Sequence, residues 1–346
     1  MKRYLTRLPA LAAAVCSVAV LAACGTDEET TETAKPAEAE KKLKVAMVTD
    51  IGGLNDRSFN ALAYKGLKDA ESQLGVDIRA VTSKSNADYV PNLSSLARQK
   101  YDVIFAVGFL MGDATDKVAK SFPNTRFAII DFSTAALKSK PKNVQGLLFK
   151  ENEAGYLAGY MAGLYVKDKG GEQVISTVGG LKVPPVDAYI AGYQAGAKAA
   201  NPEIKALNGY SQDFVDQAKC KELALNQIEQ GSQVVFQVAG QCGLGAIDAA
   251  KEKSVQAIGV DSDQGYIGEQ VLTSALKRID KAVLSTITDV QKDAYKGGED
   301  TIFDAKTDGV ALGKTNTEGS KLLPKVEEIK KQIASGEVTD IPTEVE

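Results

Sequence analysis

The feature that most constrains the fold is an alternation of short apolar runs with segments of helical periodicity, beginning near residue 43. A typical run is 101–108 (YDVIFAVG), and a typical helical segment is 58–74, whose apolar residues recur at helical spacing before Gly75. Such alternation is typical of βαβ units, in which parallel strands form a sheet that helices cover on both faces. The sequence therefore predicts an α/β protein built on parallel sheets.

The alternation occurs twice along the chain. The first half has expected strands at 43–49, 77–83, 101–108, 125–131 and 144–150, with helices at 58–74, 90–100 and 113–121. After a helical segment at 151–168, the second half has expected strands at 173–180, 205–210, 233–240 and 255–261, with helices at 186–200, 213–229 and 243–253. A folded region of about 300 residues exceeds a usual single core, so we expect two doubly wound lobes.

The elements after residue 261 are too few for a third lobe: strands at 272–278 and 301–305, and helices at 281–295 and 319–335. We therefore expect the chain to cross back to the first lobe and return, which makes a hinge. Lobe 1 would comprise 43–150 plus about 275–300, and lobe 2 would comprise 151–274 plus about 301–340. In such folds, ligands bind between the lobes at the carboxyl ends of the strands.

The amino terminus has the layout of a secretory signal peptide, with three basic residues ahead of the apolar run 8–23. A membrane-spanning helix is the alternative, although a span needs about 20 apolar residues. The ending LAAC resembles a bacterial lipobox, so we expect cleavage after residue 23 and a lipid on Cys24. Residues 24–42 would then be a disordered acidic tether. These features predict anchoring on the extracytoplasmic face of a bacterial cell membrane.

Composition excludes several functions. The chain has 41 Lys and Arg against 45 Asp and Glu, and loss of the basic signal peptide would make it more acidic still. An acidic body argues against nucleic-acid binding. Histidine, the commonest general base and metal ligand, is absent, so we expect no metal, cofactor or catalytic site. The glycine clusters at 240–245 and 309–315 match neither a dinucleotide-binding motif nor a P-loop.

The residues that close the apolar strands are the candidates for a binding site. Asp50, Asp131, Gly240 and Asp261 each follow such a strand. A single aspartate there is more often a helix cap or turn residue, but three of them form a less ordinary set.

Phe59 and Phe214 each open an expected helix, one in each half. Two such rings would clamp a flat molecule, each stack contributing about 1–3 kcal/mol. The alternative is that either ring belongs to the core. Cys220 and Cys242 are both expected at the carboxyl edge of the second sheet, where a disulfide is reasonable in an exported protein. Two free thiols are the alternative.

Several segments resemble the basic membrane protein family, whose best-understood members are purine-nucleoside-binding lipoproteins of ABC transporters. The strongest are 48–60 (VTDIGGLNDRSFN), 238–246 (VAGQCGLGA), 258–263 (IGVDSD) and 272–283 (LTSALKRIDKAV), within a colinear match from 43 to about 297. The resemblance implies a type I periplasmic-binding fold with three crossings between lobes. It also implies a captured nucleoside that is delivered to a membrane permease.

The resemblance also implies roles for individual residues. Phe59 and Phe214 would sandwich the base; Asp50, Asn60 and Asp131 would bind its polar edges or part of the sugar; Gly240, Asp261 and Lys277 would hold the ribose. Cys242 departs from the family, because relatives usually carry a small or hydroxyl residue there.

We therefore expect a monomeric, lipid-anchored substrate-binding protein that closes on a nucleoside, a purine rather than a pyrimidine, and catalyses no reaction. The alternatives are a binding protein for a sugar or another small polar metabolite, a nucleoside hydrolase, and a surface adhesin or sensor on the same fold.

Overall fold

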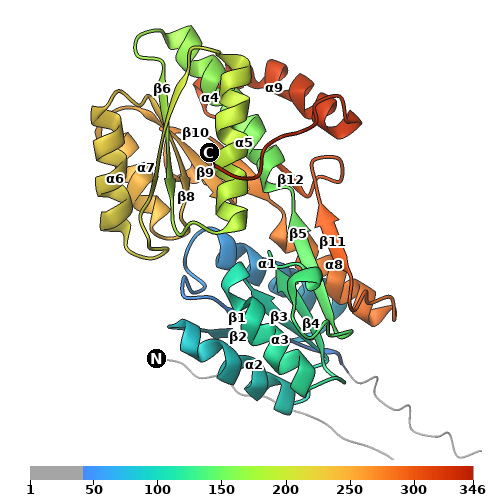
Figure 1. Ribbon diagram of the computed structural model, residues 1–346. Coiled ribbons are helices and arrows are strands. Elements are labelled where there is room, and N and C mark those ends of the chain that lie inside the picture. Colours follow the sequence, from blue (N-terminus) through green and yellow to red (C-terminus); the bar gives the residue numbers. More distant parts are fainter. Residues whose placement is uncertain (1–41, 346) are drawn as a thin grey trace, which may run out of the picture. The chain divides into compact units, whose positions relative to one another are not determined.

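The computed structural model describes residues 42–345. The predicted signal peptide, Cys24 and the tether up to residue 41 lie outside the described residues. Within the described part, the chain forms two six-stranded sheets with helices between the strands (Figure 1). Strand pairs in both sheets are parallel, apart from one antiparallel pair in the second. This confirms the predicted α/β class with two mainly parallel sheets.

The first sheet and its helices form lobe 1. Its strands are β1 (Lys44–Thr49), β2 (Asp77–Thr82), β3 (Val103–Val107), β4 (Arg126–Ile130), β5 (Val144–Phe149) and β11 (Asp300–Phe303). Its helices are α1 (Phe59–Leu74), α2 (Tyr89–Arg98), α3 (Gly112–Ser121) and α8 (Ile279–Gln291). The strand order is β11-β5-β4-β3-β1-β2.

Strand β1 shows why this sheet needs helices on both faces. Val45 and Met47 pack in the same core cluster as residues of α1 and α8, whereas Ala46 and Val48 pack with residues of α2 and α3. Successive side chains of a strand point to opposite faces, so a continuously apolar strand must be covered on both sides. The apolar run that predicted this strand thus also fixes its position inside the sheet.

The second sheet and its helices form lobe 2. Its strands are β6 (Val174–Gly179), β7 (Lys205–Tyr210), β8 (Val234–Val238), β9 (Gln256–Asp261), β10 (Val271–Lys277) and β12 (Val310–Leu312). Its helices are α4 (Glu151–Lys169), α5 (Pro184–Ala200), α6 (Gln217–Glu229), α7 (Gly243–Glu252) and α9 (Thr317–Ser335). The strand order is β12-β10-β9-β8-β6-β7, with α6 and α7 on one face and α4 and α5 on the other (Figure 1).

Helices α4 and α5 pack unusually closely because glycines line their contact. A Cβ atom added to Gly159 of α4 would lie 1.9 Å from the carbonyl oxygen of Tyr193, and one added to Gly196 of α5 would lie 2.0 Å from that of Tyr156. No side chain fits at such distances, so the glycine face of residues 151–168 serves helix packing inside lobe 2.

The chain crosses between the lobes three times within residues 42–345. It passes from β5 into α4, from β10 into α8, and from β11 into β12. The rings of Phe149 and Phe303, at the ends of the paired strands β5 and β11, stack with their centroids 5.0 Å apart. The chain thus returns to lobe 1 for α8 and β11 before it ends in lobe 2, and two of the crossings are packed against each other.

Two helix boundaries differ from the prediction by four residues. Helix α6 begins at Gln217 rather than Asp213, because the Asp213 carboxylate accepts from the N–H groups of Val215 and Asp216 and holds a turn there. Phe214 therefore lies in the loop before the helix. Helix α8 ends at Gln291, and Tyr295 instead donates its hydroxyl to the carbonyls of Phe127 and Asn143. The sequence reading also missed β12, which has three residues.

Cys220 of α6 and Cys242, which precedes α7, are joined by a disulfide with their Cα atoms 5.6 Å apart. The bond links the start of α6 to the loop that follows β8. Across residues 42–345, the helices are too short or too polar for any of them to cross a membrane.

Candidate ligand-binding cleft

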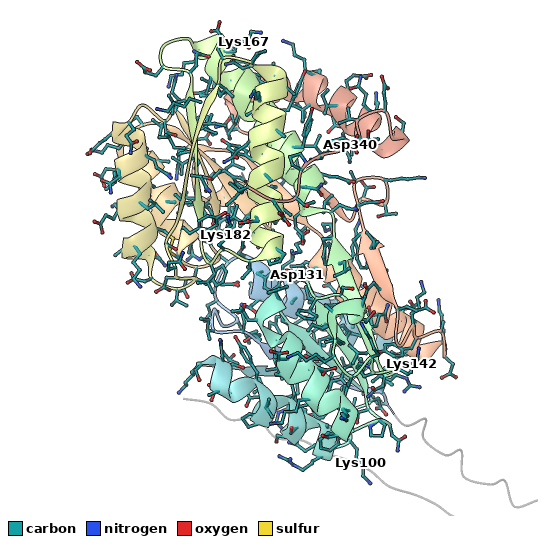
Figure 2. All side chains as sticks on the ribbon, viewed as in Figure 1. Lys100, Asp131, Lys142, Lys167, Lys182 and Asp340 are labelled. Atoms are coloured by element: carbon teal, nitrogen blue, oxygen red, sulfur yellow. A yellow bond between two sulfur atoms is a disulfide. The ribbon has the colours of Figure 1, made fainter. Side chains whose placement is uncertain are left out.

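The carboxyl ends of the strands of both sheets border a cavity of about 80 Å³ between the lobes. All eight ligand-binding residues expected from the sequence line it: Asp50, Phe59, Asn60, Asp131, Phe214, Gly240, Asp261 and Lys277. In Figure 2, Asp131 of lobe 1 lies next to the end of lobe 2 that carries Lys182. Parallel strands place their carboxyl ends at one edge of a sheet, which explains why residues from such distant parts of the sequence meet here.

The lobe 1 wall is organised around two aspartates. Asp50 follows β1, and the Asn60 side chain donates from Nδ2 to Asp50 at 2.7 Å and to Asp56 at 3.1 Å. Asp56 also accepts from the backbone N–H groups of Ser58, Asn60 and Ala61, so it caps the amino terminus of α1. Asp56 was not expected from the sequence, because this residue does not follow a strand. Burial raises the pKa of Asp50 to about 6.

Phe59, the first residue of α1, is half-buried and lines the cavity. Gly108, which follows β3, makes room for it. A Cβ atom on Gly108 would lie 3.6 Å from the Phe59 ring and 3.2 Å from the Asp50 carboxylate, and the φ of this residue is +121°. Glycine alone adopts such a backbone without strain, so it keeps this part of the wall open to both side chains.

Phe214 lines the cavity from lobe 2. Its ring covers Gly180, where an added Cβ atom would approach the ring to 2.2 Å. Its carbonyl accepts from the N–H of Cys242 at 3.0 Å, so the loop that carries the ring is tied to the glycine loop after β8. The disulfide between Cys220 and Cys242 reinforces the same connection.

Lys277 ends β10 and is 1% exposed. Its ammonium group lies 2.6 Å from Asp131 and 2.8 Å from Glu151, and 5.2 Å and 5.0 Å from the ring centroids of Phe59 and Phe149. Desolvation lowers the pKa of Lys277, but the charges of Asp131 and Glu151 outweigh it and raise the pKa above its ordinary value. Lys277 is therefore charged, and Glu151, which the sequence reading missed, holds it from behind.

Asp131 and Asp261 share an unusual backbone conformation, with φ values of +69° and +61°. Aspartate tolerates this left-handed region better than most residues, and strained backbone of this kind is concentrated at functional sites. Asp261 accepts from the Ser58 hydroxyl at 2.8 Å and from the Tyr189 hydroxyl at 3.3 Å. Burial raises the pKa of Asp261 to about 6. Both strands thus end by turning a carboxylate into the cavity.

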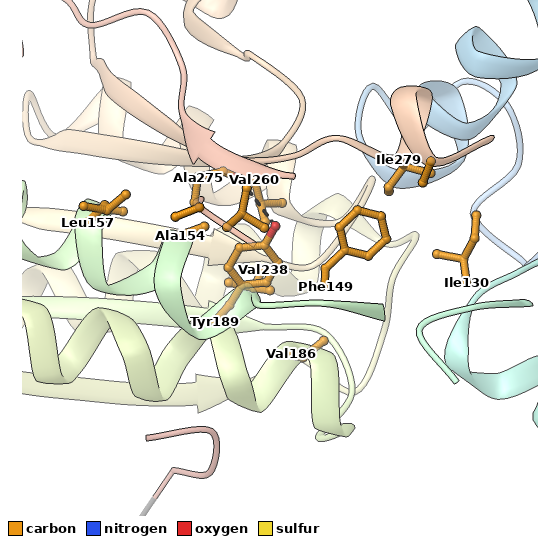
Figure 3. Packing of buried hydrophobic residues seen from close by; sticks show 14 of the residues in the cluster. Ile130, Phe149, Ala154, Leu157, Val186, Tyr189, Val238, Val260, Ala275 and Ile279 are labelled. Atoms are coloured by element: carbon orange, nitrogen blue, oxygen red, sulfur yellow. Dashed lines mark hydrogen bonds between the residues drawn. The ribbon is translucent and has the colours of Figure 1, made fainter. Parts of the chain in front are cut away.

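Tyr189 of α5 is a further lining residue that the sequence reading missed. Figure 3 shows its hydroxyl turned toward β10, where it lies 3.5 Å from the carbonyl oxygen of Ala275. The ring fills the floor of the cavity on the lobe 2 side, packed edge-on to Phe236.

The two lobes also touch directly at the edge of the cavity. The carbonyl of Arg57, whose φ is +56°, accepts from Ser262 Oγ at 2.8 Å and from Gln264 Nε2 at 3.1 Å. Together with the contact between Ser58 and Asp261, these bonds join the loop before α1 to the loop after β9.

The arrangement suits the binding of a planar molecule rich in hydrogen-bond donors. Two aromatic rings come from opposite lobes, and partly and fully buried aspartates offer acceptors on the cavity wall. Within residues 42–345, no group of three carboxylate or thiol side chains is placed to hold a metal ion.

Two similar α/β lobes, a hinge of three crossings and a cleft at the strand ends define a solute-binding protein of the type I periplasmic fold. The comparison with known families agrees, because residues 43–342 match the model of the PnrA-like ABC transporter substrate-binding proteins. The chain belongs to this family.

Individual relatives are similar over almost their whole length. The chain is 34% identical to the ABC transporter nucleoside-binding protein BmpA of Lactococcus lactis, over 98% of this chain and 99% of that protein. It is also 34% identical to the CD4+ T-cell-stimulating antigen of Listeria innocua, over 95% and 96% respectively. A solved solute-binding protein of an ABC transporter system from Aeropyrum pernix is similar with a TM-score of 0.79 and 28% identity, over 87% of this chain and 94% of that one.

The class of the protein follows from these matches. It is a substrate-binding protein of an ABC transporter, a class that binds small ligands and works with a membrane permease. Family and fold are those of binding proteins rather than enzymes.

Proposed function

We propose that this protein captures nucleosides, purines in preference to pyrimidines, and delivers them unchanged to the permease of an importer. In this proposal it acts as a monomer on the extracytoplasmic face of the cell membrane, held there by a lipid on Cys24. In this proposal, the strands and helices within residues 44–149 and 279–303 move as one lobe, and those within residues 151–277 and 310–335 move as the other.

One observation carries the proposal: Phe59 and Phe214 line the same cavity from opposite lobes, surrounded by carboxylates. A nucleoside matches this chemistry because its base stacks on aromatic rings while its sugar hydroxyls donate to acceptors. In this proposal, Asp50, Asn60 and Asp131 would bind the polar edges of the base or part of the sugar, as the family resemblance implies. Gly240, Asp261 and Lys277 would hold the ribose. The nucleoside-binding relative from Lactococcus lactis supports the same ligand class.

Closure of the cleft would be the signal to the permease. A ligand that contacts both lobes binds the closed state more tightly than the open one, so it shifts the population toward closure. The hydrogen bonds between Arg57 and the loop of Ser262 and Gln264 would then form as part of the closed state.

The test is thermal unfolding of the purified protein with a panel of purine nucleosides, pyrimidine nucleosides and sugars. A ligand at 100 times its dissociation constant should add about 2.7 kcal/mol to the unfolding free energy. We expect purine nucleosides to stabilise most and to be recovered without turnover. Stabilisation by sugars alone would contradict the proposal.

Substitution of the two rings sharpens the test. Phe59→Ala and Phe214→Ala should each weaken nucleoside binding by about 1–3 kcal/mol, because each removes one stacking partner. The melting temperature without ligand should change little, since both rings are only half-buried. Tyr266→Ala removes an aromatic side chain that is 65% exposed in lobe 2 and is the matched control. Unchanged affinity together with a large loss of stability would show that the rings are core residues.

The proposed anchor is tested separately. Cys24→Ser should release the protein from the membrane fraction into the soluble extracytoplasmic fraction, because lipid attachment requires the thiol. Retention of the variant in the membrane would contradict a lipid on this residue.

A further inference from the structure

We propose that the cleft prefers nucleosides whose base carries a positive charge, such as N-alkylated purine nucleosides, over neutral nucleosides of the same size. This inference rests on the proposed function and specifies the ligand of the same cavity. Its basis is the charge, the hydrogen-bonding character and the aromatic walls of the site.

The described walls of the cavity carry far more negative than positive charge. In the described part of the chain, four aspartates and one lysine line the cavity: Asp50, Asp56, Asp131, Asp261 and Lys277. Asp56 is 1% exposed and Asp261 is 7% exposed, so water screens these charges poorly. A ligand with an anionic group, such as a phosphorylated nucleoside, would be repelled, whereas a cation would be attracted.

Lys277 does not cancel this excess, because its charge is already matched. Its ammonium group lies 2.6 Å from Asp131 and 2.8 Å from Glu151, and Glu151 sits behind it rather than on the cavity wall. These three groups together carry a net negative charge when ionised. Asp50, Asp56 and Asp261 then add to the negative potential at the ligand.

The edge of the cavity beside α1 offers acceptors rather than donors. Both hydrogens of the Asn60 amide are used, at 2.7 Å on Asp50 and 3.1 Å on Asp56. The reverse orientation of the amide would place its oxygen against two carboxylate oxygens. Asn60 Oδ1 is thereby left as a buried acceptor without a partner. Alkylation of a purine ring makes its remaining N–H groups stronger donors, which suits this edge.

The aromatic walls favour the same ligand. The face of an aromatic ring carries partial negative charge, so a cationic ring stacks on it more favourably than a neutral ring of equal area. Phe59 and Phe214 present such faces from the two lobes. The negative charge of the cavity, its acceptor-rich edge beside α1 and its two aromatic rings therefore favour one chemical class of ligand: a flat, donor-rich, cationic base on a ribose.

The test compares isomers that differ in charge but not in size. 1-Methyladenosine is cationic at neutral pH and its isomer N6-methyladenosine is neutral. 7-Methylguanosine has a positively charged imidazolium ring, which loss of its N1 proton partly balances near neutral pH, and its isomer N2-methylguanosine has no such ring, so the adenosine pair is the stronger test. Isothermal titration of the full protein should give dissociation constants at least about tenfold lower for the cationic member of each pair, equivalent to about 1.4 kcal/mol.

Two variants show whether cavity charge is the cause. Asp50→Asn keeps the shape of the side chain and removes one negative charge, so the ratio between isomers should fall severalfold. Asp168→Asn removes the same charge from the exposed far end of α4 and should leave the ratio unchanged.

The outcomes separate this inference from the proposed function. If adenosine or guanosine binds but neither cationic isomer binds more tightly than its neutral isomer, the inference is wrong and the proposed function stands. An isomer ratio that Asp168→Asn lowers as much as Asp50→Asn also overturns it, because the preference would then come from net charge. If no nucleoside of either kind binds, the proposed function itself fails.

Discussion

The two lobes share one strand order and differ in what they place at the ends of equivalent strands. Lobe 1 contains β5-β4-β3-β1-β2 and lobe 2 contains β10-β9-β8-β6-β7, so each strand end has a counterpart across the cleft. β4 and β9 end in the same way, because Asp131 and Asp261 each adopt a positive φ. A common fold has therefore kept the same way of presenting a carboxylate on both walls.

The ends of β1 and β6 are where the lobes diverge. Asp50 follows β1, whereas Gly180 follows β6 and lies under the ring of Phe214. At this pair of strand ends, lobe 1 offers a carboxylate and lobe 2 offers a ring over glycine backbone. Elsewhere on the cavity wall, lobe 1 also carries a ring, Phe59, and lobe 2 also carries a carboxylate, Asp261. Under the proposed function, the lobe 1 wall after β1 would select the ligand through hydrogen bonds, and the Phe214 ring of lobe 2 would cover the ligand on closure.

We expect the largest effect on the unfolding free energy at the buried ion cluster of Asp131, Glu151 and Lys277, which joins the two lobes. Lys277→Met removes the cation between Asp131 and Glu151 and leaves two buried carboxylates facing each other. We expect a loss of about 3–5 kcal/mol of unfolding free energy at neutral pH, measured by urea denaturation. The loss should shrink toward acid pH, because protonation then relieves the repulsion.

Lys321→Met is the control for that variant. Lys321 also makes an ion pair, at 2.8 Å from Glu318, but its side chain is 63% exposed. Its loss should cost less than about 1 kcal/mol. Equal effects of the two substitutions would mean that the buried ion cluster does not join the lobes energetically.

This cluster also marks the limit of what the sequence could predict. The strands and the residues at their ends followed from local pattern, because a continuously apolar run must lie inside a covered sheet and its last residue must face the cleft. Glu151 and Lys277 are 126 residues apart, and no local pattern pairs them. Lys277 was expected only from family resemblance, and Glu151 was not expected at all.

Other features that the sequence did not predict, such as the role of Asp56 and the start of α6, have equally local causes. Asp56 looked like one more polar residue in a loop, yet it caps α1 through three backbone N–H groups. The start of α6 was placed four residues early, because helical periodicity continues through a turn that the Asp213 carboxylate holds in place. Periodicity reports which residues are buried together, but not where side chains compete for the backbone.

A second prediction concerns the covalent link in lobe 2. Replacing Cys220 and Cys242 by serine opens a loop of 22 residues and should lower the unfolding free energy by about 3 kcal/mol. Nucleoside affinity should fall as well, because the loop of Phe214 is tied to Cys242. Rapid thiol labelling of the native wild-type protein without reductant would contradict the disulfide on which this prediction depends.

A third prediction tests whether the buried carboxylate of Asp50 in lobe 1 lowers the stability of the fold while it contributes to ligand binding. Burial raises the pKa of Asp50 to about 6 from about 3.9 in an unfolded chain. The native state thus holds this proton more tightly, and the contribution of Asp50 to stability falls as pH rises from about 4 to about 6. Asp50→Asn should therefore be more stable than wild type at neutral pH by about 1–3 kcal/mol, and the difference should vanish near pH 4.

The same variant should bind nucleosides more weakly, which separates the two roles of Asp50. Thermal unfolding across this pH range, with and without ligand, measures both effects. Asp168→Asn, at an exposed position, should show neither effect. A variant that is less stable than wild type at neutral pH would show that the buried carboxylate is a net stabilising group.

The smallest effect is expected at the contact that closes the cleft without touching ligand. Ser262→Ala removes the hydrogen bond from lobe 2 to the Arg57 carbonyl and leaves the bond from Gln264 in place. If this contact forms only on closure, its loss disfavours the closed state by about 0.5–1.5 kcal/mol, and nucleoside affinity should fall by the corresponding factor of about 2 to 10. The unfolding free energy without ligand should stay nearly constant when the open state predominates.

Ser335→Ala is the control, because it removes a comparable hydroxyl from an exposed helix end; it should change neither the affinity nor the unfolding free energy. An unchanged affinity in Ser262→Ala would mean that ligand contacts alone drive closure, and the division of roles between the lobes would then rest entirely on the residues inside the cavity.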